Sequence, residues 1–114
     1  MQGKRLDRVN QLIKEEISLV LQRELKDPRL GFITVTEVET ANDLRVAKVF
    51  VSVLGDEGRW AASLTALKSA RGFIRHWLRS HLDLRVTPEL DFRPDRSMAH
   101  AARIQELLKQ LGDK

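Results

Sequence analysis

Apolar residues recur every three or four positions along the first part of the chain, from Leu6 to Leu25. This spacing is typical of a helix that buries one face. The pattern stops at Asp27-Pro28, because proline lacks a backbone donor and disfavours the helical conformation of its predecessor. The sequence therefore predicts a long first helix that ends before Pro28.

Two runs rich in β-branched and aromatic residues follow, at residues 32–38 and 45–53. Residues of these types favour pleated, half-buried strands. Between the runs, the Thr-Ala-Asn-Asp segment at residues 40–43 has the composition of a turn. We expect the two strands to pair as an antiparallel hairpin.

Helical spacing returns after the glycine-rich loop at residues 55–58 and continues to about Leu82, interrupted by Gly72. Residues 86–92 then alternate apolar and polar positions, and Pro88 within them favours an edge strand or an irregular strand end. The helical crossover predicts that this third strand runs parallel to the second, with a right-handed connection. Asp95 or Ser97 can cap a last helix, whose apolar residues are Ala101, Ile104, Leu107, Leu108 and Leu111.

The length of 114 residues predicts a single domain over residues 1–114. The absence of cysteine excludes a disulfide framework and thiolate chemistry. The N-terminal segment mixes charged and apolar positions, which argues against a signal peptide, and no stretch is apolar enough to span a bilayer. We expect a soluble, cytoplasmic protein that does not associate with membranes.

The formal net charge of +4 is unevenly distributed along the chain. Residues 59–85 hold six basic side chains against the single acid Asp83, whereas residues 30–58 hold two basic and five acidic side chains. On one continuous helix over residues 67–82, four of the basic side chains would lie within an arc of about 80°; they are Lys68, Arg71, Arg75 and Arg79. Phosphate groups of RNA suit such a basic face, although a solvated surface explains the charge pattern too.

Other positions extend or qualify this hypothesis. We add Arg85 and the N-terminal residues Lys4, Arg5 and Arg8 to the predicted RNA-binding set, although Asp7 dilutes the N-terminal group. Gly72 destabilises a helix interior by about 1 kcal/mol relative to alanine. A kink or the close approach of a neighbouring backbone could each explain it, and the residues alone do not decide between them.

Several segments, in order along nearly the whole chain, resemble the ribosome-binding factor A family. They include Lys-Asp-Pro-Arg-Leu-Gly at residues 26–31, Ala-Arg-Gly-Phe-Ile-Arg at 70–75, Pro-Glu-Leu-Asp-Phe at 88–92 and Asp-Arg-Ser at 95–97. The resemblance implies an α+β fold of the KH-like type II, in the order helix-strand-strand-kinked helix-strand-helix. It also implies a three-stranded mixed sheet with helices packed on one face, and a structural kink at Ser69, Ala70 and Gly72 in place of the usual Gly-x-x-Gly loop.

The same resemblance implies a bacterial assembly factor that binds the immature 30S ribosomal subunit and assists late processing and maturation of its 16S rRNA. A role in cold adaptation, a monomeric state and contacts with ribosomal proteins come with it as further expectations. KH domains usually clamp single-stranded nucleotides with the Gly-x-x-Gly loop. Because that loop is missing, we expect the protein to recognise the backbone of folded RNA.

Two other classes of function compete with RNA binding. An enzyme is disfavoured, because His76 and His81 lie on different helix faces, the adjacent Glu15 and Glu16 diverge, and no nucleotide-binding motif is present. We therefore expect no catalytic residue, no metal site and no cofactor. A protein-interaction module remains the alternative, supported by the acidic segment at residues 30–58, which could meet a basic ribosomal protein. Of the two tryptophans, we expect Trp77 to be buried and leave open whether Trp60 stacks on RNA bases.

Overall fold

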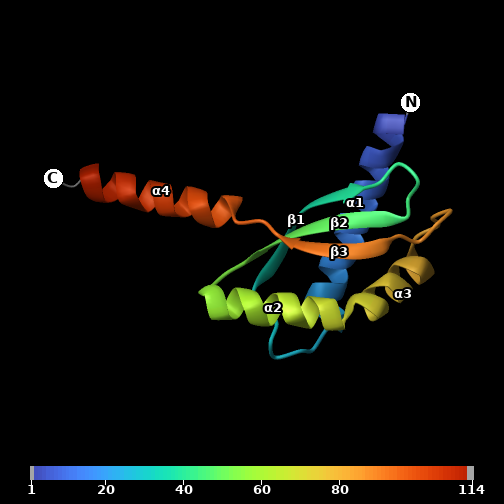
Figure 1. Cartoon of the computed structure of the whole chain (residues 1–114), viewed down its shortest axis with the longest axis horizontal. Helices are drawn as coiled ribbons and strands as arrows, with labels where there is room; N and C mark the ends of the chain where they lie inside the picture. The colour runs from blue at the N-terminus through green and yellow to red at the C-terminus, as the bar shows by residue number, and fades with distance from the viewer. Residues whose placement is uncertain (1, 113–114) are drawn as a thin grey trace.

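The structure is a computed structural model that describes residues 2–112, with the side chains of Gln2 and of residues 98–102 left out (Figure 1). Its elements follow the predicted order. They are α1 (Gln2–Leu19), which continues into a π-helical turn η1 (Val20–Glu24), β1 (Ile33–Thr40), β2 (Val46–Val53), α2 (Glu57–Ser69), α3 (Arg71–His81), β3 (Glu89–Pro94) and α4 (Ser97–Gly112).

The strands of the described chain form one mixed sheet in the order β1-β2-β3. β1 pairs with β2 antiparallel and β2 pairs with β3 parallel, so the predicted hairpin and crossover are both confirmed. β3 lies at the edge of the sheet, with Pro88 just before it and Pro94 at its end. The edge position explains the prolines, because neither has to donate to an inner ladder. The predicted α+β class with a three-stranded mixed sheet is confirmed.

The core lies between the sheet and the three helices α1, α2 and α3, which pack on one face of it. Ile13 and Ile17 of α1, Leu67 of α2, and Ile74 and Leu78 of α3 are fully buried there. They meet the inward side chains of the strands, which alternate along β2 as a strand period requires. The sheet residues of this core are Val35, Val38, Ala47, Val49, Val51, Leu90 and Phe92.

The first helix ends earlier than its apolar pattern predicts. Regular α-helix stops at Leu19, and η1 carries the helical path to Glu24, where the Leu25 amide donates to the carbonyl oxygen of Val20 at 3.0 Å. Asp27 then stabilises the turn at Pro28 and Arg29, because its carboxylate accepts from the backbone amide of Arg29 at 2.9 Å. The wider η1 turn keeps Val20 in the core.

The long second helix is broken at Ala70, so the kinked helix that the family resemblance implies is confirmed. The arc of charges calculated for one continuous helix over residues 67–82 therefore does not apply. Ser69 ends α2, Ala70 leaves the helical conformation (φ −89°, ψ 1°), and α3 begins at Arg71. Gly72 lies in the first turn of α3, outside the left-handed region, and a Cβ atom there would meet nothing within 4 Å. Neither a glycine-only conformation nor a close neighbouring backbone therefore explains Gly72.

α4 forms as predicted but extends away from the three-helix layer, as Figure 1 shows. Its side chains from Arg103 to Gly112 are all exposed, whereas the side chain of Ala101 lies outside the described part. Asp95 lies two residues before α4, and its carboxylate accepts from both the backbone amide and the hydroxyl of Ser97, at 2.9 and 2.6 Å. Asp95 also accepts from the hydroxyl of Thr36 at 2.6 Å, which ties the start of α4 to β1.

Candidate nucleic-acid interface

The first basic surface lies along α3. A shallow hollow of about 270 Å³ is lined by Arg71, Gly72, Arg75, His76, Arg79 and Glu89, and we call it the α3 hollow. Arg71 and Arg79 are exposed, and no acid of the described side chains lies within ion-pair distance of either guanidinium. The bare Gly72 between them leaves room for a ligand to come against the helix backbone.

Arg75 plays a different part in the same hollow. Its Nη2 donates to the carbonyl oxygen of Thr87 at 2.9 Å, and its Nε donates to that of Pro88 at 3.3 Å. Glu89 lies 3.6 Å from its Nη1. The predicted RNA ligand Arg75 is thus already bonded within the protein and holds α3 against the segment that leads into β3.

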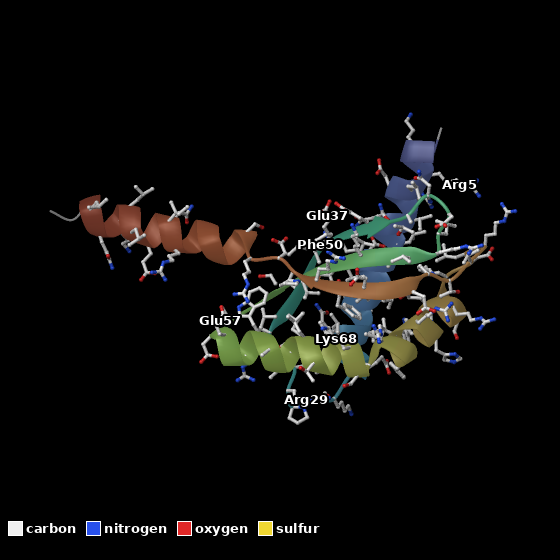
Figure 2. The ribbon with its side chains drawn as sticks, viewed as in Figure 1. Arg5, Arg29, Glu37, Phe50, Glu57 and Lys68 are labelled. Carbon is white, nitrogen blue, oxygen red and sulfur yellow. The ribbon has the colours of Figure 1, made fainter. Side chains whose placement is uncertain are left out.

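The break at Ala70 also separates Lys68 from the rest of the predicted row. Lys68 lies in the last turn of α2, exposed, and is absent from the lining of the α3 hollow (Figure 2). The four predicted basic residues could share one face only on an unbroken helix. The structure therefore keeps Arg71 and Arg79 together and leaves Lys68 as a neighbouring exposed cation.

A second basic surface joins residues that are far apart in the sequence. Arg5 of α1, Arg45 before β2 and Arg85 before β3 line a cleft of about 420 Å³, which we call the turn cleft. The predicted residues Lys4 and Arg8 are exposed on α1 but do not line it. Sequence reasoning missed Arg45, although its place directly after the predicted turn was a usable signal. Backbone pairing fixes that place, since the Arg45 carbonyl accepts from the Glu89 amide at 2.8 Å.

The two basic surfaces share one end of the molecule. In Figure 1, α3, the loop before β3, the β1–β2 turn and the start of α1 gather there, with α4 at the opposite end. Of the acids of the middle segment, Asp43 lines the turn cleft. Glu37 and Glu39 are exposed on the open face of the sheet, and Asp56 caps α2 by accepting from the Arg59 amide. Arginines outnumber acids in the lining of both surfaces, so we call this end of the molecule the basic end. This excess of positive charge favours an anionic partner there.

Both tryptophan side chains make contacts within the protein. Trp60 is only 3% exposed, and the guanidinium of Arg96 lies 4.4 Å from the centre of its ring. Trp77 is half-buried, donates to a carboxylate oxygen of Glu16 at 3.3 Å and stacks on His81 with ring centres 3.8 Å apart. Arg96 also hydrogen-bonds Glu57 and thereby lowers the pKa of that carboxyl group. Base stacking on Trp60 would require these contacts to open.

The described side chains include no group of three or more histidine, aspartate or glutamate residues that could hold a metal ion. Of the two histidines considered above, His76 lines the α3 hollow and His81 bonds to the Trp77 carbonyl through Nδ1 at 2.9 Å. Within residues 2–112, none of the helices combines the length and hydropathy that crossing a bilayer would need.

The sequence profile described as ribosome-binding factor A matches residues 5–108. This chain belongs to the ribosome-binding factor A family. Among curated relatives, the ribosome-binding factor A of Halothermothrix orenii is 48% identical over 114 residues, which is all of this chain and 93% of that protein.

Solved structures of family members confirm the fold. The solution structure of a Thermotoga maritima protein, described as a putative ribosome binding factor A, superposes with a TM-score of 0.73 at 35% identity, covering 82% of this chain and 89% of that one. A homology model of the Thermus thermophilus factor, fitted into a cryo-electron-microscopy map of a 30S complex, gives a TM-score of 0.62 at 31% identity. It covers 75% of this chain and 90% of that one. The family resemblance read from the sequence is thereby confirmed.

Proposed function

We propose that the protein is a cytoplasmic ribosome assembly factor that binds the immature 30S subunit through its basic end and catalyses no reaction. The observation that carries this proposal is the α3 hollow, where Arg71 and Arg79 stand exposed and without acidic partners among the described side chains. Guanidinium groups donate in a fork that matches phosphate oxygens, and binding them releases counterions from RNA. Family membership and the 30S complex of the Thermus relative support the choice of ribosomal RNA.

The geometry favours folded RNA over an extended single strand at the α3 hollow. The hollow is shallow, its cations are spread along one helix, and Gly72 allows the sugar-phosphate backbone to lie against α3. Charge and shape recognition of this kind reads the path of phosphates and not a base sequence. Assisting late 16S rRNA processing then means holding or masking a region of folded rRNA until it matures.

Sedimentation through a density gradient tests the proposal. The protein should travel with precursor small subunits, less with mature small subunits and not with large subunits. With about four phosphate contacts, the logarithm of the association constant should fall with a slope of about −4 in the logarithm of the salt concentration. Equal association with large subunits, or binding that does not depend on salt, would contradict it.

One observation favours a second candidate, a docking surface for a basic ribosomal protein. Glu37 and Glu39 stand exposed on the open face of the sheet, which α1, α2 and α3 do not cover (Figure 2). Changing both to lysine should leave binding to purified rRNA intact or strengthen it. A selective loss of binding to assembled subunits, with rRNA binding retained, would favour the protein-docking alternative.

A further inference from the structure

The turn cleft combines two chemical characters that the α3 hollow lacks. Arg5, Arg45 and Arg85 supply cations to its lining, and four apolar side chains supply another part, which we call its floor. At about 420 Å³, its volume lies in the range of about 300–1,000 Å³ that is usual for small-molecule sites. Figure 2 shows Arg5 at this end of the molecule, near the β1–β2 turn. The apolar lining residues are Leu6, Val9, Leu44 and Val86.

The charged side chains that line the turn cleft favour the binding of an anion. Its only acid among the lining residues is Asp43, which lies 3.9 Å from Arg45 with both side chains mostly exposed. No ion pair within the described side chains involves Arg5 or Arg85. Two guanidinium groups that are far apart in the sequence therefore line one cleft, and neither forms an ion pair within the described side chains. A phosphate group is the anion that they fit best.

The apolar floor of the cleft is complementary to a flat apolar group beside that phosphate. Val86 is 39% exposed, and Leu6, Val9 and Leu44 are half-buried, so water covers apolar surface that the fold leaves uncovered. Asn42 also lines the cleft, and its side-chain amide can both donate and accept hydrogen bonds. An apolar face, a polar edge and a phosphate occur together in one nucleotide whose base is not stacked on its neighbours.

The backbone at Leu44 supports a functional floor. Leu44 has φ +63°, in the left-handed region where glycine, asparagine and aspartate are favoured and leucine is strained. Its amide donates to the Ala41 carbonyl at 2.9 Å, which holds the turn in this form. A leucine kept in an unfavourable conformation indicates that its side chain contributes something that the turn itself does not need, and strained residues gather at binding sites.

We propose that the turn cleft binds a single unstacked nucleotide of RNA, with its base on Leu44 and Val86 and its phosphate between Arg5 and Arg85. This inference rests on the proposed function, since the nucleotide belongs to the RNA that the basic end binds. It adds a single-strand site to a surface that otherwise follows folded RNA backbone. The cleft thus selects RNA that has an unpaired residue next to a folded segment.

Fluorescence anisotropy with a short labelled single strand, and with a blunt duplex of the same strand, tests this assignment on the full chain. Leu44→Asn removes the apolar floor and suits the left-handed backbone, so it should keep its melting temperature. It should weaken single-strand binding by about five- to tenfold and leave duplex binding unchanged. Val86→Ser is a second variant with the same expected result, and Arg5→Gln with Arg85→Gln should weaken single-strand binding as well.

The outcomes separate the two proposals. If Leu44→Asn and Val86→Ser bind the single strand as the wild type does, while Arg71→Glu with Arg79→Glu loses its affinity for precursor small subunits, the turn cleft is no nucleotide site and the proposed function stands. If wild-type protein binds neither RNA form nor small subunits, both proposals fall. A 5′-mononucleotide that displaces the strand at equal concentration would show a site for free nucleotide, which overturns the assignment to RNA.

Discussion

Arg75 donates from Nη2 to the carbonyl oxygen of Thr87 at 2.9 Å and so fastens α3 to the segment that leads into β3. We expect Arg75→Gln to lower the free energy of unfolding by about 1–2 kcal/mol, because the carbonyls of Thr87 and Pro88 lose a charged donor. Urea unfolding measures this. Arg79→Gln, a matched change on the same helix, should alter stability by less than about 0.5 kcal/mol. Equal effects of the two changes would contradict the structural role of Arg75.

Gly72 should be replaceable by alanine with a gain in stability. Its backbone is outside the left-handed region and its Cβ position is open, so Gly72→Ala should stabilise α3 by about 0.5–1 kcal/mol. Gly55→Ala is the contrasting variant, because Gly55 has φ +136° and a Cβ there would lie 2.9 Å from side-chain atoms of Arg59. Thermal unfolding should therefore show opposite shifts, and a destabilised Gly72→Ala would refute this description of the helix break.

These two positions show what the sequence could and could not predict about the second helix. Apolar spacing located the helix, and the family resemblance located the kink between Ser69 and Gly72. The break itself falls at Ala70, because that residue leaves the helical conformation while Gly72 stays in it. The spacing of charges could not show that Arg75 would be bonded to the loop before β3, since that contact arises only when the crossover closes.

The pKa of Asp95 makes the joint between β1 and α4 sensitive to acid. Hydrogen bonds from the Ser97 hydroxyl, the Thr36 hydroxyl and the Ser97 amide lower this pKa below its usual value, outweighing the opposite effect of burial. The contribution of these hydrogen bonds to the stability of the folded state is complete above the pKa of Asp95 in the unfolded chain, which is about 3.9. It is lost as the pH falls through the lower pKa of Asp95 in the folded state. Thr36→Val should lower the melting temperature at neutral pH.

The difference between Thr36→Val and the wild type should narrow as the pH falls toward about 2, because protonated Asp95 no longer gains from accepting the Thr36 hydrogen bond as a charged group. Melting temperatures across this range measure the effect. Thr34→Val on the same strand is exposed and serves as the control. A difference for Thr36→Val that stays constant down to the lowest pH would contradict the linkage.

α4 should contribute little to the stability of the isolated protein. Leu107 and Leu111 are 49% and 66% exposed, so changing both to glutamate should alter the free energy of unfolding by less than about 0.5 kcal/mol per site. Leu67→Ala in the core is the opposite control, with an expected loss of about 2–5 kcal/mol. Denaturant unfolding compares the three proteins. A large loss from the α4 changes would show that the helix packs against the domain.

The basic end illustrates how far sequence reasoning reaches for a binding surface. The excess positive charge in residues 59–85 predicts a basic surface that includes Arg71, Arg79 and Arg85. The turn cleft was not predictable, because Arg5, Arg45 and Arg85 come together only through the pairing of β2 with β3 and the packing of α1. The strained backbone conformation of Leu44 was likewise not predictable, because neither leucine nor its neighbours Asp43 and Arg45 indicate it in the sequence.

The affinity for precursor small subunits after paired charge reversal tests the central claim most directly. Arg71→Glu with Arg79→Glu brings the formal net charge from +4 to zero, and Arg103→Glu with Lys109→Glu on the exposed α4 makes the same change at the other end of the molecule. We predict that the α3 pair weakens binding by at least about 100-fold and reduces the salt slope by about 2, while the α4 pair changes affinity by less than about threefold. Equal losses from both pairs, or full binding by the α3 pair, would contradict a site on α3.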